Sequence, residues 1–315
     1  MSRIIHRSFD EPHDYARCIR LARVSDLIVS ERGSFKATLT VVNVGHVWLQ
    51  SGGESLARTM RIAIGDSPRS LAFLADGQDA PVIQSGAEFG AGDVVCFGRN
   101  TNHFQRSFGP IRWMAISVKP GAFERAIKAM TGAELLDPSA SLWGKPSAET
   151  LNRLRALHIE VIRMASAGEV TLDHPGVQLS LEQAFAGAMT ACLTNGADGP
   201  YSPGRSRHQQ VMLRFAEWLD TNNDRAVYLQ DVCSALGVSA PTLRRCCTEH
   251  LGMTPMHYLW LRRMNLARQE LRLRPTSVTA AAMNFGFWHL GRFAEEYRTL
   301  FGESPGATLA RHSAS

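Results

Sequence analysis

The sequence predicts an α+β chain: an N-terminal antiparallel β-barrel or sandwich followed by helices, then an all-α C-terminal domain. Two patterns predict this class. Between residues 35 and 118, short β-like runs alternate with turns, whereas from about Ala122 to Leu193 apolar residues recur at helical spacing. After residue 207 the pattern is helical throughout.

A segment without periodicity, NGADGPYSPGRSR, separates the two parts. It is rich in Gly, Pro and Ser, which is typical of an interdomain linker. We therefore expect a first domain at 1–195, a linker at 196–207 and a second domain at 208–315. At 315 residues the chain is long enough for two domains that each bury a core.

The β-like runs are punctuated by Gly, Asp, Asn and Pro at short intervals, which favours antiparallel strands. They are FKATLTVVNVGHVWLQ, TMRIAI, RSLAFLA, APVIQ, DVVCFG and IRWMAISV. In the helical part that follows, one face is marked by apolar residues at helical spacing, namely Leu151, Leu154, Leu157 and Val161.

The composition is that of a soluble globular protein, with 44% hydrophobic and 20% charged residues. No apolar run approaches the ~18 residues of a membrane span, and the start of the chain has no signal-like apolar stretch. We therefore expect a cytoplasmic protein without a membrane partner. The six cysteines lack paired spacing, which favours reduced, buried thiols over disulfides or a zinc site.

The positive charge is concentrated in the C-terminal third. From Arg205 to the end there are 14 Arg, no Lys and 9 acidic residues, so this part carries the whole net charge of +5. Arginine binds phosphates and guanine edges through a planar fork of donors. A basic excess alone is also typical of solvated helices, so it favours a nucleic-acid partner but does not establish one.

An internal repeat carries the functional prediction. The segment YLQDVCSALGVSAPTLRRCCTEHLGMTP is matched by the segment SVTAAAMNFGFWHLGRFAEEYRTLFGESP. Matching residues of the two copies are 49 positions apart before the turn and 50 positions apart after it. In each copy, apolar residues at helical spacing end at a glycine, Gly237 or Gly286, and a second helix follows a short turn. Glycine adopts the left-handed conformation of such a turn at little cost.

Two observations favour DNA binding over a plain helical hairpin. A helix, a glycine turn and a second helix form the unit that places a helix in the major groove, and here two such units lie within the basic part of the chain. Ser239 is expected to cap the second helix of the first unit, with Pro241 in its first turn. Between the units, His257 to Leu273 is predicted to be one continuous helix of roughly 25 Å, on the scale that separates successive major-groove segments.

The last ~105 residues resemble the DNA-binding domain of the AraC/XylS family of bacterial transcription regulators. The resemblance rests on LQDVCSALGVSAPTLRRCCTEHLGMTPMHYLWLRRMNLARQEL and on VTAAAMNFGFWHLGRFAEEYRTLFGESPGATL, with its GF turn, Phe293 and FGESP ending. It implies helix-turn-helix units near 226–250 and 275–300 that bind double-stranded promoter DNA, as an activator or a repressor, and it implies contact with RNA polymerase.

The resemblance also implies which side chains face DNA. In the first recognition helix they are Pro241, Thr242, Arg244 and Arg245, with Arg244 expected to read guanine and the amides near Ser239 expected to meet phosphate. In the second they are Trp288, His289, Leu290, Arg292 and Glu295. Glu295 stands where the family often has arginine, which removes a phosphate contact and leaves a carboxylate able to accept from cytosine N4. For each side chain the alternative is a solvated helix face, and Phe285, Phe287, Phe293 and Tyr297 are expected in the core.

The β-rich part resembles, more loosely, the cupin-like sensing and dimerisation domains of many family members, on the segment GAEFGAGDVVCFGRNTNHF. Its histidines His46 and His103 stand alone and no HxH motif exists, so we expect no metal, no other cofactor and no catalysis. Aromatic residues of this part either line an effector pocket or fill an ordinary core: Trp48, Phe73, Phe89, Phe97, Phe104 and Trp113. The helices from 146 to 195 are candidates for a homodimer interface.

Three hypotheses follow from the sequence. The first is a transcription regulator that responds to a small-molecule effector bound by the N-terminal domain. The second is a regulator controlled by a protein partner or by its own abundance. The third is a cupin-type metal enzyme with a DNA-binding appendage, which the missing ligand cluster disfavours.

Overall fold

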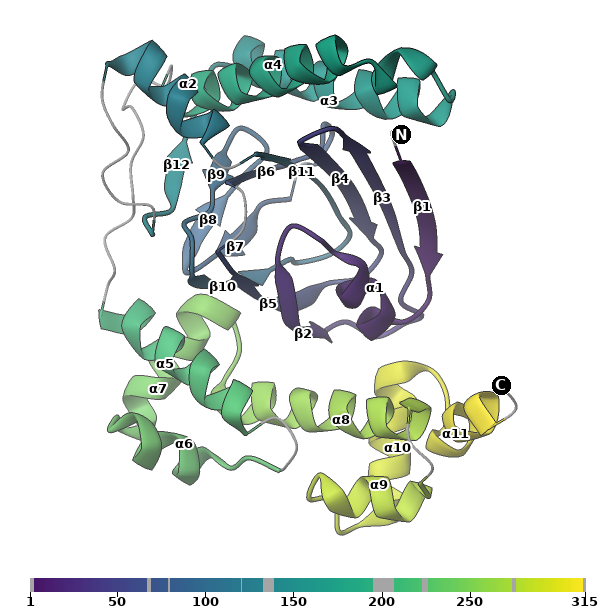
Figure 1. The fold of residues 1–315 in the computed structure, drawn as a ribbon. Coiled ribbons are helices and arrows are strands. Elements are labelled where there is room, and N and C mark those ends of the chain that lie inside the picture. Colours follow the sequence, from purple (N-terminus) through teal and green to yellow (C-terminus); the bar gives the residue numbers. More distant parts are fainter. Residues whose placement is uncertain are drawn as a thin grey trace.

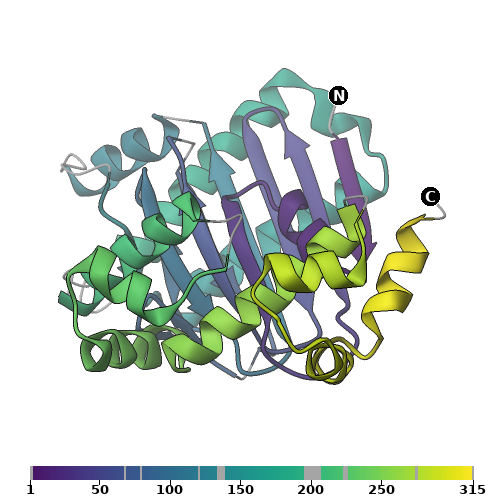
Figure 2. The same ribbon diagram turned by 90° about the horizontal axis from the view of Figure 1, so that it is seen from below.

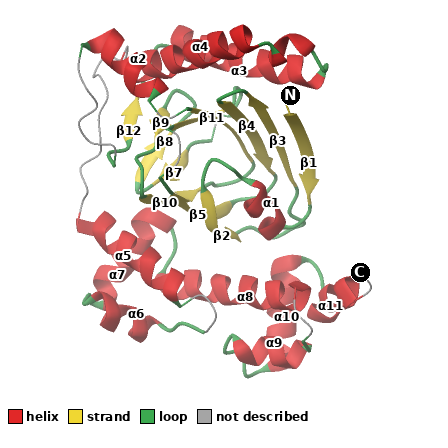
Figure 3. Ribbon diagram, viewed as in Figure 1, coloured by secondary structure: helices red, strands yellow, loops and turns green. Residues whose placement is uncertain are grey.

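The computed structural model describes residues 3–66, 69–78, 80–119, 121–132, 139–194, 207–222, 226–273 and 276–313. The chain forms an α+β fold in which two antiparallel sheets lie between two layers of helices (Figure 1; Figure 3). Apart from Arg207, which begins a helix, the predicted linker at 196–207 lies outside the described residues.

The N-terminal strands divide into two sheets. The larger sheet has the order β1-β3-β4-β11-β6-β9-β12 and the smaller has the order β2-β5-β10-β7-β8. The strands are β1 (Arg3–Phe9), β2 (Arg23–Val29), β3 (Ala37–Val44), β4 (Val47–Glu54), β5 (Arg58–Ile64), β6 (Ser70–Leu74), β7 (Val82–Gln84), β8 (Ala87–Phe89), β9 (Val94–Cys96), β10 (Thr101–Arg106), β11 (Ile111–Val118) and β12 (Leu142–Gly144). All pairings between them are antiparallel.

The α+β class and the antiparallel N-terminal strands are confirmed, but the barrel is not closed. Closure requires every edge strand to pair with a further strand. Within the described residues, β1 and β12 edge the larger sheet while β2 and β8 edge the smaller one. The predicted barrel is therefore an open pair of facing sheets, and β1, β2, β8, β10 and β12 were not among the predicted strands.

A first helical layer covers the larger sheet. It contains α2 (Ala122–Thr131), α3 (Ala148–Ser166), the short 3-10 helix η1 (Val170–Asp173) and α4 (Pro175–Thr194). Leu151, Leu154 and Val161 of α3 are buried in one core with β3, β4, β6, β9 and β11. The helical prediction for 122–193 is confirmed for α2, α3 and α4, but β12 (Leu142–Gly144) is a strand within this range. The short helix α1 (Pro12–Cys18) between β1 and β2 was not predicted.

The second helical layer is the C-terminal domain. It contains α5 (Arg207–Thr221), α6 (Leu229–Leu236), α7 (Ala240–Leu251), α8 (Pro255–Leu273), α9 (Val278–Asn284), α10 (Leu290–Phe301) and α11 (Pro305–Ser313). Seen from below, α8 runs across the strands of the N-terminal domain (Figure 2). Ile28 of β2 and Phe104 of β10 belong to the same buried cluster as the core of these helices, so the two domains share an apolar contact.

His158 on α3 makes the N-terminal core sensitive to acid. Its ring is fully buried with its edge toward Phe73, and burial lowers its pKa to about 4. Because the unfolded chain takes up this proton near pH 6.5, the stability that the neutral ring retains above that pH is lost as the pH falls toward 4.

We expect the free energy of unfolding to drop by about 2 kcal/mol between pH 7 and pH 5 on account of His158 alone. Urea unfolding of the wild-type chain and of the His158→Gln variant at both pH values measures this drop in the free energy of unfolding. The variant is expected to lose less stability than the wild type on acidification, and equal losses in the two proteins would contradict the assignment.

Candidate nucleic-acid interface

The first repeated unit folds as a helix, a glycine turn and a second helix. α6 ends at Gly237, whose φ of 62° lies in the left-handed region that favours glycine. The Ser239 hydroxyl caps α7 by accepting a hydrogen bond from the backbone N–H of Thr242 at 3.3 Å. The predicted turn and the predicted serine cap are therefore confirmed.

One face of α7 is buried and the opposite face is open. The buried face consists of Leu243, Cys246, Cys247, His250 and Leu251. Pro241, Arg244 and Arg245 are exposed, while Thr242 is half-buried with its hydroxyl 2.9 Å from that of Ser239. Both arginines thus project away from the core, and among the described residues neither forms an ion pair.

The second unit repeats the arrangement with α9 and α10. Gly286 has a φ of 76°, matching Gly237 in the first unit. The predicted core aromatics are all buried, namely Phe285, Phe287, Phe293 and Tyr297. Phe287, Phe293 and Tyr297 form consecutive ring contacts on the inner side of α10, which leaves its outer side free for other contacts.

The outer side of α10 is less cationic than that of α7. Trp288 is 67% exposed and Leu290 is 36% exposed, and His289 lies between them at the helix N-terminus. Arg292 is also exposed, but its Nε lies 2.8 Å from the Glu296 carboxylate. Glu295 is exposed beside this pair and Arg298 is exposed in the last turn, so α10 carries two carboxylates and two guanidinium groups.

α8 holds the two units at a set distance. It is continuous over 19 residues, or roughly 28 Å, and begins two residues before the predicted start. The Arg263 guanidinium lies over the rings of Tyr228 from the first unit and Phe287 from the second. Trp260 donates a hydrogen bond to Glu296 of α10 at 3.1 Å. These contacts fix the orientation of both recognition helices relative to α8.

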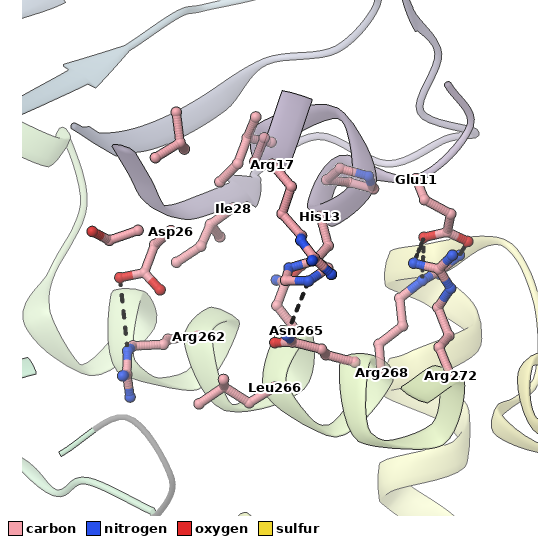
Figure 4. Close-up of a pocket in the computed structure, with 16 residues that line it drawn as sticks. Glu11, His13, Arg17, Asp26, Ile28, Arg262, Asn265, Leu266, Arg268 and Arg272 are labelled. Atoms are coloured by element: carbon pink, nitrogen blue, oxygen red, sulfur yellow. Dashed lines mark hydrogen bonds and ion pairs between the residues drawn. The ribbon is translucent and has the colours of Figure 1, made fainter. Parts of the chain in front are cut away.

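Three arginines of α8 serve the contact between the domains. Figure 4 shows Glu11 facing Arg268 and Arg272, and Asp26 facing Arg262. Arg268 Nη2 lies 2.8 Å from Glu11 Oε1, and Arg272 Nη2 lies 2.8 Å from an oxygen of Asp14.

The prediction that the whole positive excess surrounds a DNA-binding surface is therefore too broad. The guanidinium groups of Arg262, Arg268 and Arg272 are buried or nearly so and are neutralised by N-terminal carboxylates. These pairs lie beside a hollow of about 90 Å³ between α1, β2 and α8, which is lined by both charged and apolar side chains. Arg244 and Arg245 of α7, and Arg298 in the last turn of α10, remain exposed and without an ion pair among the described residues.

A fourth buried arginine at this contact comes from the N-terminal domain and pairs with a carboxylate of the C-terminal domain. Arg61 of β5 is 1% exposed and lies 3.0 Å from Asp26 on the neighbouring strand β2. It also donates to the Asp220 carboxylate of α5 at 2.7 Å and to the Ala216 carbonyl at 3.1 Å. One guanidinium therefore joins the smaller sheet to the first helix of the C-terminal domain.

The N-terminal histidines have structural surroundings. His103 is buried, with its ring nitrogens near the hydroxyls of Ser85 and Thr101 at 3.2 and 2.9 Å, and His46 lies exposed in the turn between β3 and β4. In the described part of the chain, no group of three His, Cys, Asp or Glu side chains is placed to hold a metal ion. All six cysteines are free, as predicted, and burial raises the pKa of Cys96 to about 12.

An apolar cavity of about 40 Å³ lies between the two sheets. Four of the six aromatics proposed for a pocket line it, namely Phe73, Phe89, Phe97 and Trp113. The other two do not: Trp48 is half-buried elsewhere on β4, and Phe104 belongs to the contact between the domains. The cavity is far smaller than the roughly 300 Å³ of a typical ligand pocket, so a ligand would have to widen it.

Among the described residues, no helix is both long enough and apolar enough to cross a membrane.

A family model described as a helix-turn-helix domain matches residues 232–311, which include most of α6 and the helices up to α11.

Two curated relatives are similar to this chain. The XylDLEGF operon transcriptional activator 2 of Pseudomonas putida is 36% identical over 102 residues, which are 31% of this chain and 65% of that protein. The "Probable thc operon regulatory protein" of Rhodococcus erythropolis is 28% identical over 205 residues, which are 64% of this chain and 61% of that protein. The chain thus spans less than two thirds of the length of each.

Among solved structures, the AraC-like transcriptional activator CuxR aligns with 85% of this chain and 96% of its own, at 14% identity and a TM-score of 0.44. The family match falls on the repeated units described above. Residues 232–311 are therefore a helix-turn-helix domain of the AraC type, similar to that of transcriptional activators such as the Pseudomonas relative.

Proposed function

We propose that this protein is a sequence-specific transcription regulator that binds double-stranded promoter DNA through α7 and α10. The observation that carries the proposal is the pair of helix-turn-helix units whose second helices both expose one face. α8, which joins the units, is roughly 28 Å long, on the scale of the 34–36 Å between successive major-groove segments on one side of a duplex.

The two helices take different roles in this proposal. Arg244 reads a guanine edge, and Arg245 binds a base or a phosphate, because both side chains are exposed and unpaired among the described residues. The backbone amides at the start of α7, next to Ser239, favour a phosphate. Pro241 and Thr242 lie on the same turn and face the same groove. His289, Arg292 and Glu295 contribute the polar contacts of α10.

The test uses the full-length protein and fragments of its source genome. Fragments retained by the protein from a sheared genomic pool are sequenced, and enriched fragments are then examined by mobility shift at about 50 mM salt with excess random DNA. We expect a shared motif and a retarded band that random DNA does not displace. Retention without any shared motif, or no retention at low salt, would contradict sequence-specific binding.

We propose further that the N-terminal domain controls DNA binding through its contact with α8 and α5. Four arginines and four carboxylates connect the domains, so a change in the position of β2 or α1 acts directly on the helix that spaces the recognition helices. The apolar cavity between the sheets favours a small, mainly apolar effector. Thermal-shift screening of the full chain against metabolites tests this, and silence across a broad library would favour control by a protein partner or by abundance.

The same proposal includes a homodimer formed through the first helical layer and activation by contact with RNA polymerase, since the Pseudomonas relative is a transcriptional activator by name. Large apolar side chains are exposed on this layer: Ile159 of α3 at 51%, Val170 of η1 at 80% and Leu179 of α4 at 56%. This layer lies on the side of the sheets opposite the C-terminal domain (Figure 1), so a dimer here leaves α7 and α10 free.

The double change Ile159→Asp with Leu179→Asp is expected to convert a dimer to a monomer, because a charge placed in an apolar interface loses its hydration. Sedimentation equilibrium at micromolar concentration measures the mass. Met256→Asp on α8 is a matched control, since Met256 is 59% exposed but lies in the other domain. A monomeric wild type, or a double variant that remains dimeric, would contradict this interface.

A further inference from the structure

The N-terminal tip of α10 exposes apolar surface that the fold does not need. Trp288 and Leu290 are 67% and 36% exposed, although neighbouring aromatics of the same unit, Phe287 and Phe293, are buried. A tryptophan of this exposure leaves a large apolar area in water, which marks a contact surface rather than a core position. Trp288 and Leu290 flank His289, the residue that precedes the first turn of the helix.

The exposed face of α7 has different chemistry. It carries Arg244 and Arg245, both exposed and without an ion pair among the described residues. On α10, Arg292 is held by Glu296 at 2.8 Å, and Glu295 adds a second carboxylate to that face. The two recognition helices therefore present opposite surfaces to a duplex: α7 a cationic one, α10 an apolar and nearly neutral one.

The major groove offers one apolar group. Guanine, cytosine and adenine present only hydrogen-bond donors and acceptors along their groove edges, whereas thymine also presents its C5 methyl group. An apolar helix tip that enters the groove therefore gains most at thymine. It gains less at guanine, where an unpaired arginine is the favoured reader.

We infer that α10 reads thymine methyl groups through Trp288 and Leu290, so that the operator pairs a guanine-containing half-site under α7 with a thymine-containing half-site under α10. This inference rests on the proposed DNA-binding function and adds the base preference of each unit. It identifies Trp288 and Leu290 as specificity-determining residues. It also makes the operator asymmetric, in contrast to one built from two copies of the same half-site.

Uracil provides the sharpest test, because it differs from thymine only by the absence of the methyl group. The probe is a duplex selected by the full-length protein from a random-sequence library and resynthesised with deoxyuridine in place of every thymidine in one half-site at a time. Burial of one methyl group corresponds to about a fourfold change in affinity. We expect uracil to weaken binding by about fourfold per contacted thymine in one half-site and to have no effect in the other.

The variants assign that effect to α10. In Trp288→Ala with Leu290→Ala, the thymine and uracil duplexes are expected to bind equally. Arg244→Ala is expected to keep the discrimination while weakening binding to both duplexes. Met256→Ala is the matched control, since it also removes an exposed apolar side chain but from α8, and it is expected to behave as the wild type. Circular dichroism verifies that each variant retains its helices.

The inference and the proposed function fail in different ways. A protein that selects a duplex but binds its thymine and uracil forms equally, or a double variant that still discriminates, overturns the thymine assignment and leaves the function standing. If the double variant keeps its DNA preference but loses transcription activation, the thymine assignment is also overturned, because the apolar tip then contacts a protein. Failure to enrich any duplex overturns the proposed function itself.

Discussion

Alanine at Arg244 is expected to weaken binding of the full-length protein to its operator by about 1–3 kcal/mol. The guanidinium projects from the exposed face of α7, and no carboxylate among the described residues competes for it. A planar fork of donors matches O6 and N7 of guanine, and the mutant leaves those acceptors without a partner. Arg245→Ala is expected to cost a similar amount if it contacts a base, and less if it contacts a phosphate.

The comparison of operator and random DNA separates these roles. Loss of a base contact relaxes specificity at one base pair, whereas loss of a phosphate contact weakens binding to all sequences and lowers the salt slope by about one. Fluorescence anisotropy over a range of salt concentrations measures both effects. Arg153→Ala on α3 is the control, because Arg153 is exposed but lies in the other helical layer. An equal loss on random DNA would show that Arg244 contacts only phosphate.

Alanine at Arg61 is expected to destabilise the contact between the domains by about 3–5 kcal/mol, the range for breaking a buried ion pair. The change leaves the Asp26 carboxylate, which is nearly buried, without its closest cation. It also removes the hydrogen bonds to Asp220 and to the Ala216 carbonyl. The C-terminal domain then loses its attachment to β5 while its own core remains intact.

Calorimetry of the full chain measures this effect. The wild type is expected to unfold with coupled domains, and Arg61→Ala with a lower-melting, separated transition. Arg163→Ala is the control, since its partner Glu160 is equally exposed and a solvated pair contributes little. If the Arg61 variant unfolds like the wild type, the domains are not held together by this network.

The helix-turn-helix units could be predicted from sequence because their physical causes are local. Gly237 and Gly286 stop helices, Ser239 caps one, and the apolar spacing along α10 defines its buried face over about three turns. The helix, turn and helix pattern also occurs twice in the sequence, so each copy supported the prediction of the other. Exposure of the two recognition helices followed, since the residues opposite a continuous apolar stripe have no partner within the unit.

The contact between the domains left no such signature. Glu11 and Arg268 are 257 residues apart, and Arg61 and Asp220 are 159 apart. Ion pairs of this kind follow no periodicity, and each partner taken alone resembles an ordinary surface charge. For the same reason, the cationic excess could be located in the C-terminal third but not divided between DNA-facing and domain-facing arginines. The short helix α1 escaped prediction because seven residues contain too little of a helical period.

Hydroxyl-radical footprinting of the full-length protein on its selected duplex tests most directly whether two helices enter successive major grooves. We expect two protected patches on one face of the DNA, centred about 10–11 base pairs apart, with only one of them weakened by Arg244→Ala. A single protected patch, or two whose spacing places them on opposite faces of the duplex, would contradict the paired arrangement of α7 and α10.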